Sequence, residues 1–184
     1  MVDLYSSHSQ SECSEETLYW KLLHGGMLCR EELEMLFPHR AEALVGSHAH
    51  TTTTSHVTLT LLPQDFGPYF SNHPWAFPGH WVGEMAAQAA GLMGMVQLVQ
   101  KLGPKALDYR NAFLMKTGDW EDRTLSVDQN SPLMALVTPE NFELTQPWAY
   151  TARVEVATGS VNPPARRYAY WGGIKVRLAR KLPR

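Results

Sequence analysis

Three side chains able to carry out acid–base chemistry lie close together near residue 80. Glu84 is a solitary carboxyl group in a stretch that contains no other charge until Lys101. Enclosing a lone carboxyl group favours its neutral form, which a general acid needs. His73 and His80 precede it, and a neutral imidazole is a suitable general base. The spacing therefore predicts proton-transfer chemistry, although a glutamate near a helix start is also an ordinary partner of the helix dipole.

Two further residues could assist that chemistry. Gln88 follows Glu84 by four positions, which places both on one helix face, so its amide could orient the carboxyl group; equally, it could satisfy a buried strand carbonyl. Gly79 at the helix start would leave backbone N–H groups open to a substrate oxygen, and it could also be a simple turn glycine. His80 lies on the same face as Glu84 and could act as the base, or line the cleft.

A long helix is predicted to position these residues. Residues 79–102 contain no charge from Met85 to Val96, and Gly103-Pro104 closes the segment. A helix that is apolar nearly all round must be enclosed, and under a single sheet it would leave one side uncovered. The preceding loop, residues 63–78, holds four prolines, which exclude a regular helix and stiffen the chain.

The remaining elements predict an α+β fold with an antiparallel sheet curled around the long helix. Short helices are expected over 15–23, ended by Gly25-Gly26, and over 30–36. Alternating residues predict one strand from Thr51 to Leu61. Further strands are expected over 111–116, 124–128, 133–137, 149–158 and 167–178, the last two forming a long hairpin. We expect residues 1–29 to be an N-terminal extension with a short helix, and residues 30–184 to be the main domain.

The segment from Phe77 to Gly91 resembles the central motif of the hot-dog-fold 3-hydroxyacyl-acyl-carrier-protein dehydratases. That motif has Pro-Gly, then an acid five residues later, then Ala-x-x-Gln-x-x-Gly. The matching residues are Pro78, Gly79, Glu84, Ala87, Gln88 and Gly91. Residues 36–40 and 167–178 are similar to two other family segments. The resemblance implies a hot-dog fold that pairs into a homodimer, with active sites at the interface between the two chains.

The same resemblance implies removal of water from a 3-hydroxyacyl thioester. His73 would be the base and Glu84 the acid, while Phe77, Gly79, His80 and Gln88 would bind substrate. However, His73 lies five residues before Pro78, where the family has eight, and a gap-free alignment places Phe70 at the base position. Either the loop is shortened or the base is lost. Thioester hydrolysis, double-bond isomerisation and non-catalytic acyl binding therefore remain alternatives.

Charge is distributed unevenly along the chain. The residues after Glu155 include seven basic side chains and no acidic one: Arg166, Arg167, Lys175, Arg177, Arg180, Lys181 and Arg184. This basic end could dock an anionic partner, and the resemblance suggests an acyl carrier protein or a coenzyme A thioester. Equally, the charges could discourage edge-to-edge sheet association. The segment 120–142, longer than expected between family strands, suggests a specialised fatty-acid, polyketide or secondary-metabolite enzyme.

Composition excludes several other classes. The 184 residues, 44% of them hydrophobic, suit one core-forming domain. Two cysteines are too few for a disulfide framework or a cysteine-built zinc site, and His48, His50 and His56 have no carboxylate or cysteine nearby in sequence. We therefore expect no metal and no cofactor. The loop aromatics lack interleaved basic residues, so nucleic-acid binding is not expected. With no apolar span and a polar, acidic N-terminus, we expect a soluble cytoplasmic protein.

Overall fold

The computed structural model describes residues 13–37, 44–52, 56–62, 79–116, 120–122, 132–143, 148–158 and 167–180. Its helices are α1 (Glu15–His24), α2 (Arg30–Leu36), α4 (Gly79–Leu102) and the short 3-10 helix η3 (Gly103–Tyr109). Its strands are β1 (Gly26–Leu28), β2 (His48–Thr51), β3 (Val57–Leu61), β4 (Asn111–Lys116), β5 (Trp120–Asp122), β6 (Leu133–Glu143), β7 (Ala149–Thr158) and β8 (Arg167–Ala179). The predicted bounds of α2, α4, β4 and β7 are confirmed.

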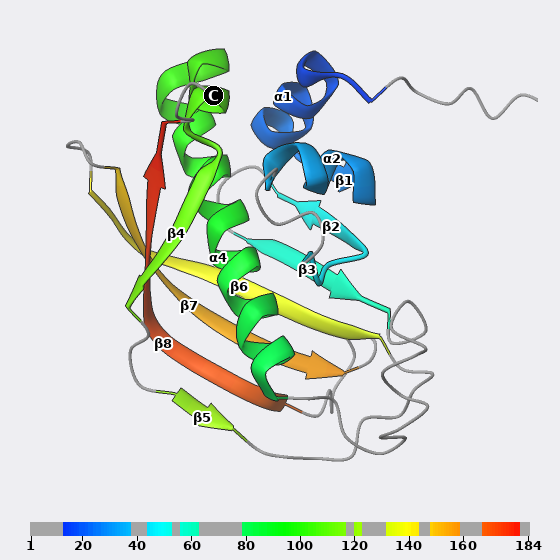
Figure 1. Ribbon diagram of the computed structural model, residues 1–184, viewed down its shortest axis with the longest axis vertical. Coiled ribbons are helices and arrows are strands. Elements are labelled where there is room, and N and C mark those ends of the chain that lie inside the picture. The colour runs from blue at the N-terminus through cyan, green and yellow to red at the C-terminus, as the bar shows by residue number, and fades with distance from the viewer. Residues whose placement is uncertain are drawn as a thin grey trace, which may run out of the picture.

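In the described part of the chain, eight strands form one antiparallel sheet. Its order is β1-β2-β3-β6-β7-β8-β4, and β5 pairs with β8 beside that path. Figure 1 shows this sheet curving around α4, which lies across its concave face. Strands β7 and β8 form the predicted long hairpin, in which Tyr150 is opposite Val176. The expected α+β architecture, a curled antiparallel sheet around a long helix, is therefore confirmed.

A bulge in β8 produces part of this curvature. The pairing register shifts between Ala152, opposite Ile174, and Val154, opposite Trp171. Two residues of β8 therefore oppose one residue of β7, which is the definition of a bulge and bends the strand that carries it. Gly173 takes a φ of 64° at this point, a backbone conformation that L side chains rarely adopt. Glycine is thus required where the strand bends (Figure 1).

Helix α4 is the centre of the hydrophobic core. From Met85 to Val99 every residue is buried except Ala87 and Gln97, which are half-buried. A Cβ atom at Gly94 would lie 3.3 Å from the side chain of Leu178 on β8, so the small residues of α4 do let the sheet approach closely. Because the helix is already enclosed by one chain, its lack of charge does not by itself require a second protomer. The homodimer stays a prediction.

Helix α1 covers the C-terminal end of α4. The Ser14 side chain caps α1 by accepting a hydrogen bond from the Thr17 backbone N–H at 3.1 Å. Leu18 and Leu22 of α1 are buried in the same core as α4. The strand that follows α1, β1, joins the sheet by pairing with β2. The amide of Gln100 on α4 donates to the Leu23 carbonyl at 2.7 Å. The proposed domain boundary at residue 30 stays a prediction, but the helix before it packs on the main core.

The single strand predicted over residues 51–61 is wrong in its first half, where the chain reverses, while its second half is confirmed as β3. Strands β2 and β3 pair antiparallel, with Thr51 opposite Val57. Thr52 closes the connection, since both its backbone N–H and its hydroxyl donate to the His56 carbonyl, at 3.1 and 2.9 Å. Threonine is favourable in strands, so the run of threonines concealed the turn.

Two other predicted strands also differ. Strand β6 continues past the predicted end at Val137 to Glu143, with a shift of register between Pro139 and Asn141 that accommodates the proline. The strand predicted over 124–128 lies outside the described residues. Strand β5, just before it, pairs with β8, with Trp120 opposite Trp171.

Candidate functional site

The candidate site is centred on the Glu84 carboxyl group in the second turn of α4. The amide of Gln88, one turn later, donates a hydrogen bond from Nε2 to Glu84 Oε1 at 3.0 Å. Gln88 is only 4% exposed, whereas Glu84 is half-buried. The four-residue spacing predicted this contact, because side chains at such positions are neighbours on a helix surface. Gln88 therefore fixes one oxygen of Glu84.

Gln88 is itself fixed from the other side. Its Oε1 accepts a hydrogen bond of 2.9 Å from the backbone N–H of Val45, in the segment that leads into β2. The sequence left open whether Gln88 would orient Glu84 or bind a strand carbonyl; it donates to Glu84, and its oxygen accepts a backbone N–H. Both ends of the buried amide are thus used, which defines its rotamer and its flip state.

The segment 44–46 that holds Gln88 is anchored by Arg30 on α2. Arg30 Nη1 donates to the carbonyls of Leu44, at 2.8 Å, and Gly46, at 3.0 Å. On the β3 side, a Cβ atom at Gly46 would collide with the Leu59 side chain, so the backbone lies close against that strand. Leu44 and Gly46 flank Val45 in the sequence, so the Arg30 guanidinium group holds the carbonyl on each side of the residue that donates to Gln88. Arg30, Val45, Gln88 and Glu84 therefore form one connected network.

The other predicted site residues are only partly described. Gly79 begins α4, and His80 follows it in the first turn, with its side chain outside the described part of the chain. His73 and Phe77, together with Phe70, lie outside the described residues. The pairing of Glu84 with an imidazole therefore stays a prediction.

Sequence reasoning missed Arg30 and the segment 44–46. Leu44, Val45 and Gly46 take part through backbone atoms, so their side-chain types give no polar signal. Arg30 lies four residues before Glu34 and donates to it at 3.1 Å, which by sequence reads as an ordinary exposed helix pair.

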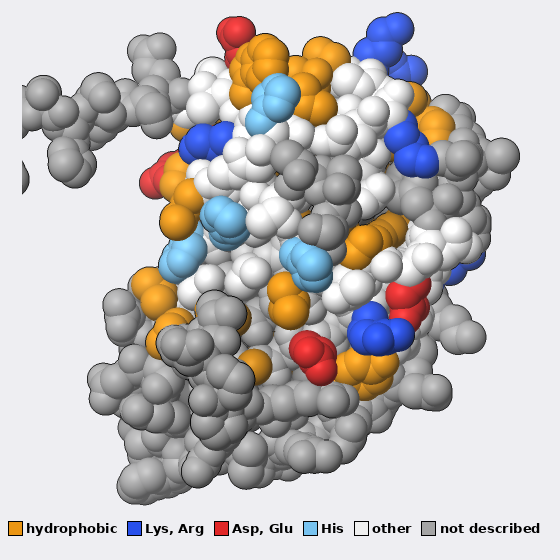
Figure 2. Space-filling view, turned by 180° about the vertical axis from the view of Figure 1, so that it is seen from behind, with side chains coloured by type: hydrophobic (Ala, Val, Ile, Leu, Met, Phe, Trp, Pro, Cys, Tyr) orange, Lys and Arg blue, Asp and Glu red, His pale blue; other side chains and the backbone are white. Residues whose placement is uncertain are grey.

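Histidine side chains gather on the outer face of the sheet, opposite α4 (Figure 2). His48 and His50 point to the same side of β2, with the buried Ala49 between them, and His56 is exposed before β3. Among the described residues these histidines do not belong to a group whose donor atoms converge closely enough to hold a metal. The outer-face histidines therefore give no metal site there.

The basic C-terminal end of the chain contributes exposed charge along β8. Arg177 is exposed and Lys175 is half-buried. Arg180 is 74% exposed and lies 3.6 Å from the carboxylate of Asp108 in η3. At such exposure an ion pair of this length contributes little to stability. Strand β8 lies between β7 and β4, so Lys175 and Arg177 do not protect a sheet edge, contrary to that interpretation of the basic end; docking of an anionic partner stays a prediction.

Comparison with known proteins shows similarity in structure alone. No protein-family model and no curated protein matches this sequence. A chain of the dehydratase heterocomplex ApeI:P from Xenorhabdus doucetiae is similar with a TM-score of 0.60 and 16% identity, covering 81% of this chain and 91% of that chain. A thioesterase family protein from Silicibacter pomeroyi has a TM-score of 0.47 and 12% identity, over 80% of this chain and 98% of that chain. For smu.793 from Streptococcus mutans UA159, bound to acetyl CoA, the values are 0.47 and 12%, over 72% and 88%.

The protein has a hot-dog fold. The curled antiparallel sheet around α4 and the similarity to the ApeI:P chain agree on this point, and at 16% identity that similarity shows the shared fold only. Within the described residues, no helix has both the length and the apolar character needed to cross a membrane.

Proposed function

We propose that this protein removes water from a 3-hydroxyacyl thioester. The observation that carries the proposal is the Glu84 carboxyl group, held on an enclosed helix by an amide that is itself held by the Val45 N–H. Such pre-organisation places a proton donor at a fixed point. A chain of a dehydratase heterocomplex has the same fold, so the fold is compatible with this chemistry.

The elimination needs a proton donor and a proton acceptor. A base removes the proton from the carbon next to the thioester, the C–O bond breaks, and the hydroxyl leaves as water with a proton from the acid. We assign the acid role to Glu84. Gln88 donates to Oε1 of this carboxyl group and so limits the positions that the proton donor can take. His73 is the proposed base, with His80 as its rival.

The start of α4 supplies the third requirement, stabilisation of the thioester oxygen as negative charge develops on it. Helix N-terminal N–H groups have no partner within the helix, and the helix dipole favours negative charge there. Gly79 begins this 24-residue helix and adds no Cβ atom that would keep the oxygen away. Phe77 would line the path of the acyl chain.

The proposal includes an assembly and an intracellular setting. Glu84 of one protomer would act with His73 of the other in a cytoplasmic homodimer. The exposed basic groups of β8, including Arg177, would meet the phosphate-bearing arm of a carrier-protein or coenzyme A thioester. The natural acyl group would come from fatty-acid, polyketide or related secondary metabolism.

The direct test is to incubate the protein with a 3-hydroxyacyl thioester and to follow enoyl thioester absorbance. We expect turnover by the wild type and a loss of at least about 100-fold in kcat for Glu84→Gln, because general acids contribute about that much or more. His73→Ala and His80→Ala identify the base, since only one of them should show a comparable loss. Glu16→Gln, an exposed carboxyl group on α1, is the matched control.

Each rival function predicts a different outcome. Release of free thiol without enoyl formation would indicate thioester hydrolysis, and migration of an existing double bond would indicate isomerisation. Tight binding of the acyl thioester without turnover would indicate a non-catalytic acyl-binding subunit. Any of these results, or unchanged turnover in Glu84→Gln, would overturn the dehydratase proposal.

A further inference from the structure

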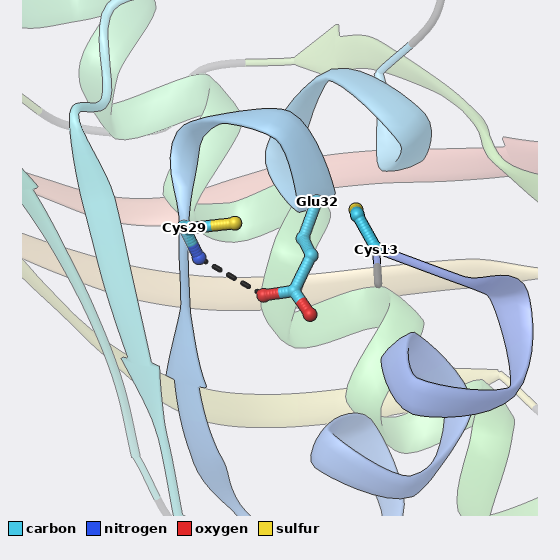
Figure 3. Close-up of side chains that lie close together, drawn as sticks. All are labelled: Cys13, Cys29 and Glu32. Carbon is cyan, nitrogen blue, oxygen red and sulfur yellow. Dashed lines mark hydrogen bonds between the residues drawn. The ribbon is translucent and has the colours of Figure 1, made fainter. Parts of the chain in front are cut away.

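A second group of reactive side chains lies far from Glu84 in the sequence, where α1 and α2 meet. Cys13 immediately precedes the cap of α1, Cys29 is the N-cap residue of α2, and Glu32 lies on α2. The two Sγ atoms and a carboxylate oxygen of Glu32 all lie within 4.8 Å of one another. Figure 3 shows these three side chains converging from the two separate segments.

The carboxylate of this group is buried and oriented. Glu32 is only 2% exposed, and Lys21 on α1 approaches its two oxygens at 2.7 and 2.8 Å. The backbone N–H of Cys29 donates to Oε2 at 3.0 Å. An ionised carboxylate can accept about four hydrogen bonds, so these three contacts leave it able to bind a cation. Hydrogen bonds of this kind orient metal-binding carboxylates in known metal sites.

The donor set matches the preferences of zinc. Zinc binds cysteine sulfur and carboxylate oxygen with four ligands in a tetrahedron. Two thiols and one carboxylate supply three of them, and a water molecule completes the fourth. A further sulfur atom is close, since Cys13 Sγ donates a weak hydrogen bond to the Met35 thioether at 3.3 Å. Soft sulfur surroundings favour thiophilic ions such as Zn²⁺ over Mg²⁺ or Ca²⁺.

The charge beside the two thiols favours a cation. Glu31 and Glu32 both lie in the first turn of α2, next to its N-cap residue Cys29. Carboxylates at this point attract a divalent cation, which displaces the thiol protons when it binds.

We propose that Cys13, Cys29 and Glu32 form a Zn²⁺ site that joins α1 to α2. On binding, each thiol loses its proton to solvent and forms a bond to zinc, and the ion retains its oxidation state. Zn²⁺ and the Lys21 ammonium group balance the charges of the two thiolates and the Glu32 carboxylate, so the assembled group carries no net charge beside the buried Glu32 side chain. The expectation of no metal weighed the two cysteines and His48, His50 and His56; the third ligand proposed here is a glutamate that the sequence did not single out.

The test is zinc binding by the full-length, reduced chain in competition with a chromophoric chelator. We expect one Zn²⁺ per chain for the wild type and at least a tenfold weaker affinity for Cys13→Ser and for Cys29→Ser. Both cysteines are exposed, so the serine variants keep the fold of the zinc-free protein, which thermal unfolding verifies. The double variant His48→Asn with His50→Asn is the matched control, since surface histidines also bind zinc, and it should retain wild-type affinity.

Two further readouts separate this site from adventitious binding. Cd²⁺ added to the wild type should produce a thiolate-to-metal charge-transfer band that is absent from the double cysteine variant. Zinc should raise the Tm of the wild type and of the histidine control, but not of the cysteine variants, because a ligand that binds only the folded state stabilises it. Glu32→Asp should retain a weaker site, and Glu32→Gln should weaken it further.

Equal zinc affinity in the wild type and in the double cysteine variant would overturn the proposal. A reduced wild type that binds no zinc would also overturn it. That conclusion would hold even if mild peroxide converted the two thiols to a disulfide in a separate experiment. Wild-type affinity in Glu32→Gln would remove the glutamate from the ligand set and overturn the site as stated. None of these outcomes depends on acyl thioester turnover.

Discussion

Glu84 and Glu32 are two helical carboxyl groups held in contrasting ways. Glu32 is buried against the Lys21 ammonium group, with contacts of 2.7 and 2.8 Å, and also accepts the Cys29 N–H. Glu84 is half-buried and accepts from the neutral amide of Gln88. The ammonium group against both oxygens of Glu32 stabilises its charged form, whereas the hydrogen bond from Gln88 to Glu84 comes from a neutral donor. The first arrangement suits structure and cation binding, and the second suits proton transfer.

The largest expected effect follows from removing the proton of Glu84. Glu84→Gln keeps the size of the side chain and an oxygen for Gln88, but it has no acidic proton. We expect kcat for enoyl formation to fall about 100-fold or more, with stability within about 0.5 kcal/mol of the wild type. Steady-state kinetics and urea unfolding measure the two quantities. If Glu84→Gln lost stability but kept its rate of enoyl formation, Glu84 would have the structural role that is assigned here to Glu32.

The next largest effect is expected from breaking the Gln88 link. Gln88→Leu leaves the buried Val45 N–H without its acceptor, which costs about 1–3 kcal/mol in the free energy of unfolding. It also frees Glu84 to move, and misplacement of a catalytic group can cost up to about 100-fold in kcat. Gln97→Leu on the same helix is the matched control, because Gln97 is a half-buried glutamine more than two turns beyond Gln88, and its amide contacts the Met93 sulfur at 3.9 Å. Equal effects in the two variants would contradict the proposed role of Gln88.

The Glu32 region is tested by removing its cation. Lys21→Met keeps the aliphatic stem but leaves the buried Glu32 carboxylate without the ammonium group. We expect a loss of about 1–3 kcal/mol in the free energy of unfolding, measured in urea without zinc. Arg153→Met removes a comparable but exposed pair, with Glu140 at 3.1 Å, and should cost less than about 1 kcal/mol. An equal or larger loss from Arg153→Met would contradict the contrast between buried and exposed pairs.

A smaller effect is expected from loosening the segment 44–46. Arg30→Lys keeps the charge but cannot reproduce the guanidinium geometry that reaches the Leu44 and Gly46 carbonyls. We expect a loss of about 1 kcal/mol in stability and a decrease in kcat smaller than that of Gln88→Leu. Glu34→Gln alters only the exposed side of Arg30 and should change stability by less than about 0.5 kcal/mol. A kcat for Arg30→Lys equal to that of the wild type would show that Arg30 does not influence the position of Glu84.

The smallest effect concerns the ionisation of the two thiols. Because their pKa values are raised in the folded chain, the thiolate fraction at a given pH is lower than in the unfolded chain. The corresponding stability is fully present at low pH and is lost as pH rises through the raised native pKa. Alkylation rates measured against pH without zinc, folded and in denaturant, should show the folded midpoint at higher pH. A folded midpoint at or below the unfolded one would contradict the partial burial of the two thiols and the effect of the neighbouring Glu31 and Glu32 carboxylates.

Local signals explain which parts of the fold the sequence predicted. The bounds of α4 follow from an apolar run closed by Gly103-Pro104, and those of α1 from Gly25, which takes a φ of 85°. The reversal between β2 and β3 has no glycine, proline or asparagine, so a run of threonines reads as one strand. The apolar sequence of α4 also predicted that the helix is enclosed. It did not predict that a single chain is sufficient to enclose it.

At the two polar sites, too, the sequence predicted the contact that depends on local spacing and missed the contacts that depend on tertiary packing. The contact between Glu84 and Gln88 follows from helix periodicity. The hold of Arg30 on the segment 44–46 uses backbone carbonyls, whose positions depend on the tertiary fold and not on side-chain type. The approach of Cys13 to Cys29 depends on how α1 packs beside α2, and no short motif encodes that packing.

The most direct test of the central claim is a crystal structure of Glu84→Gln with a bound 3-hydroxyacyl thioester, since the variant should bind substrate without converting it. We expect the 3-hydroxyl group to lie within hydrogen-bond distance of the side chain at position 84, with Gln88 still bound to the Val45 N–H. We also expect an imidazole beside the carbon that loses its proton. A substrate bound away from α4, or a side chain at position 84 turned away from the hydroxyl, would contradict the account.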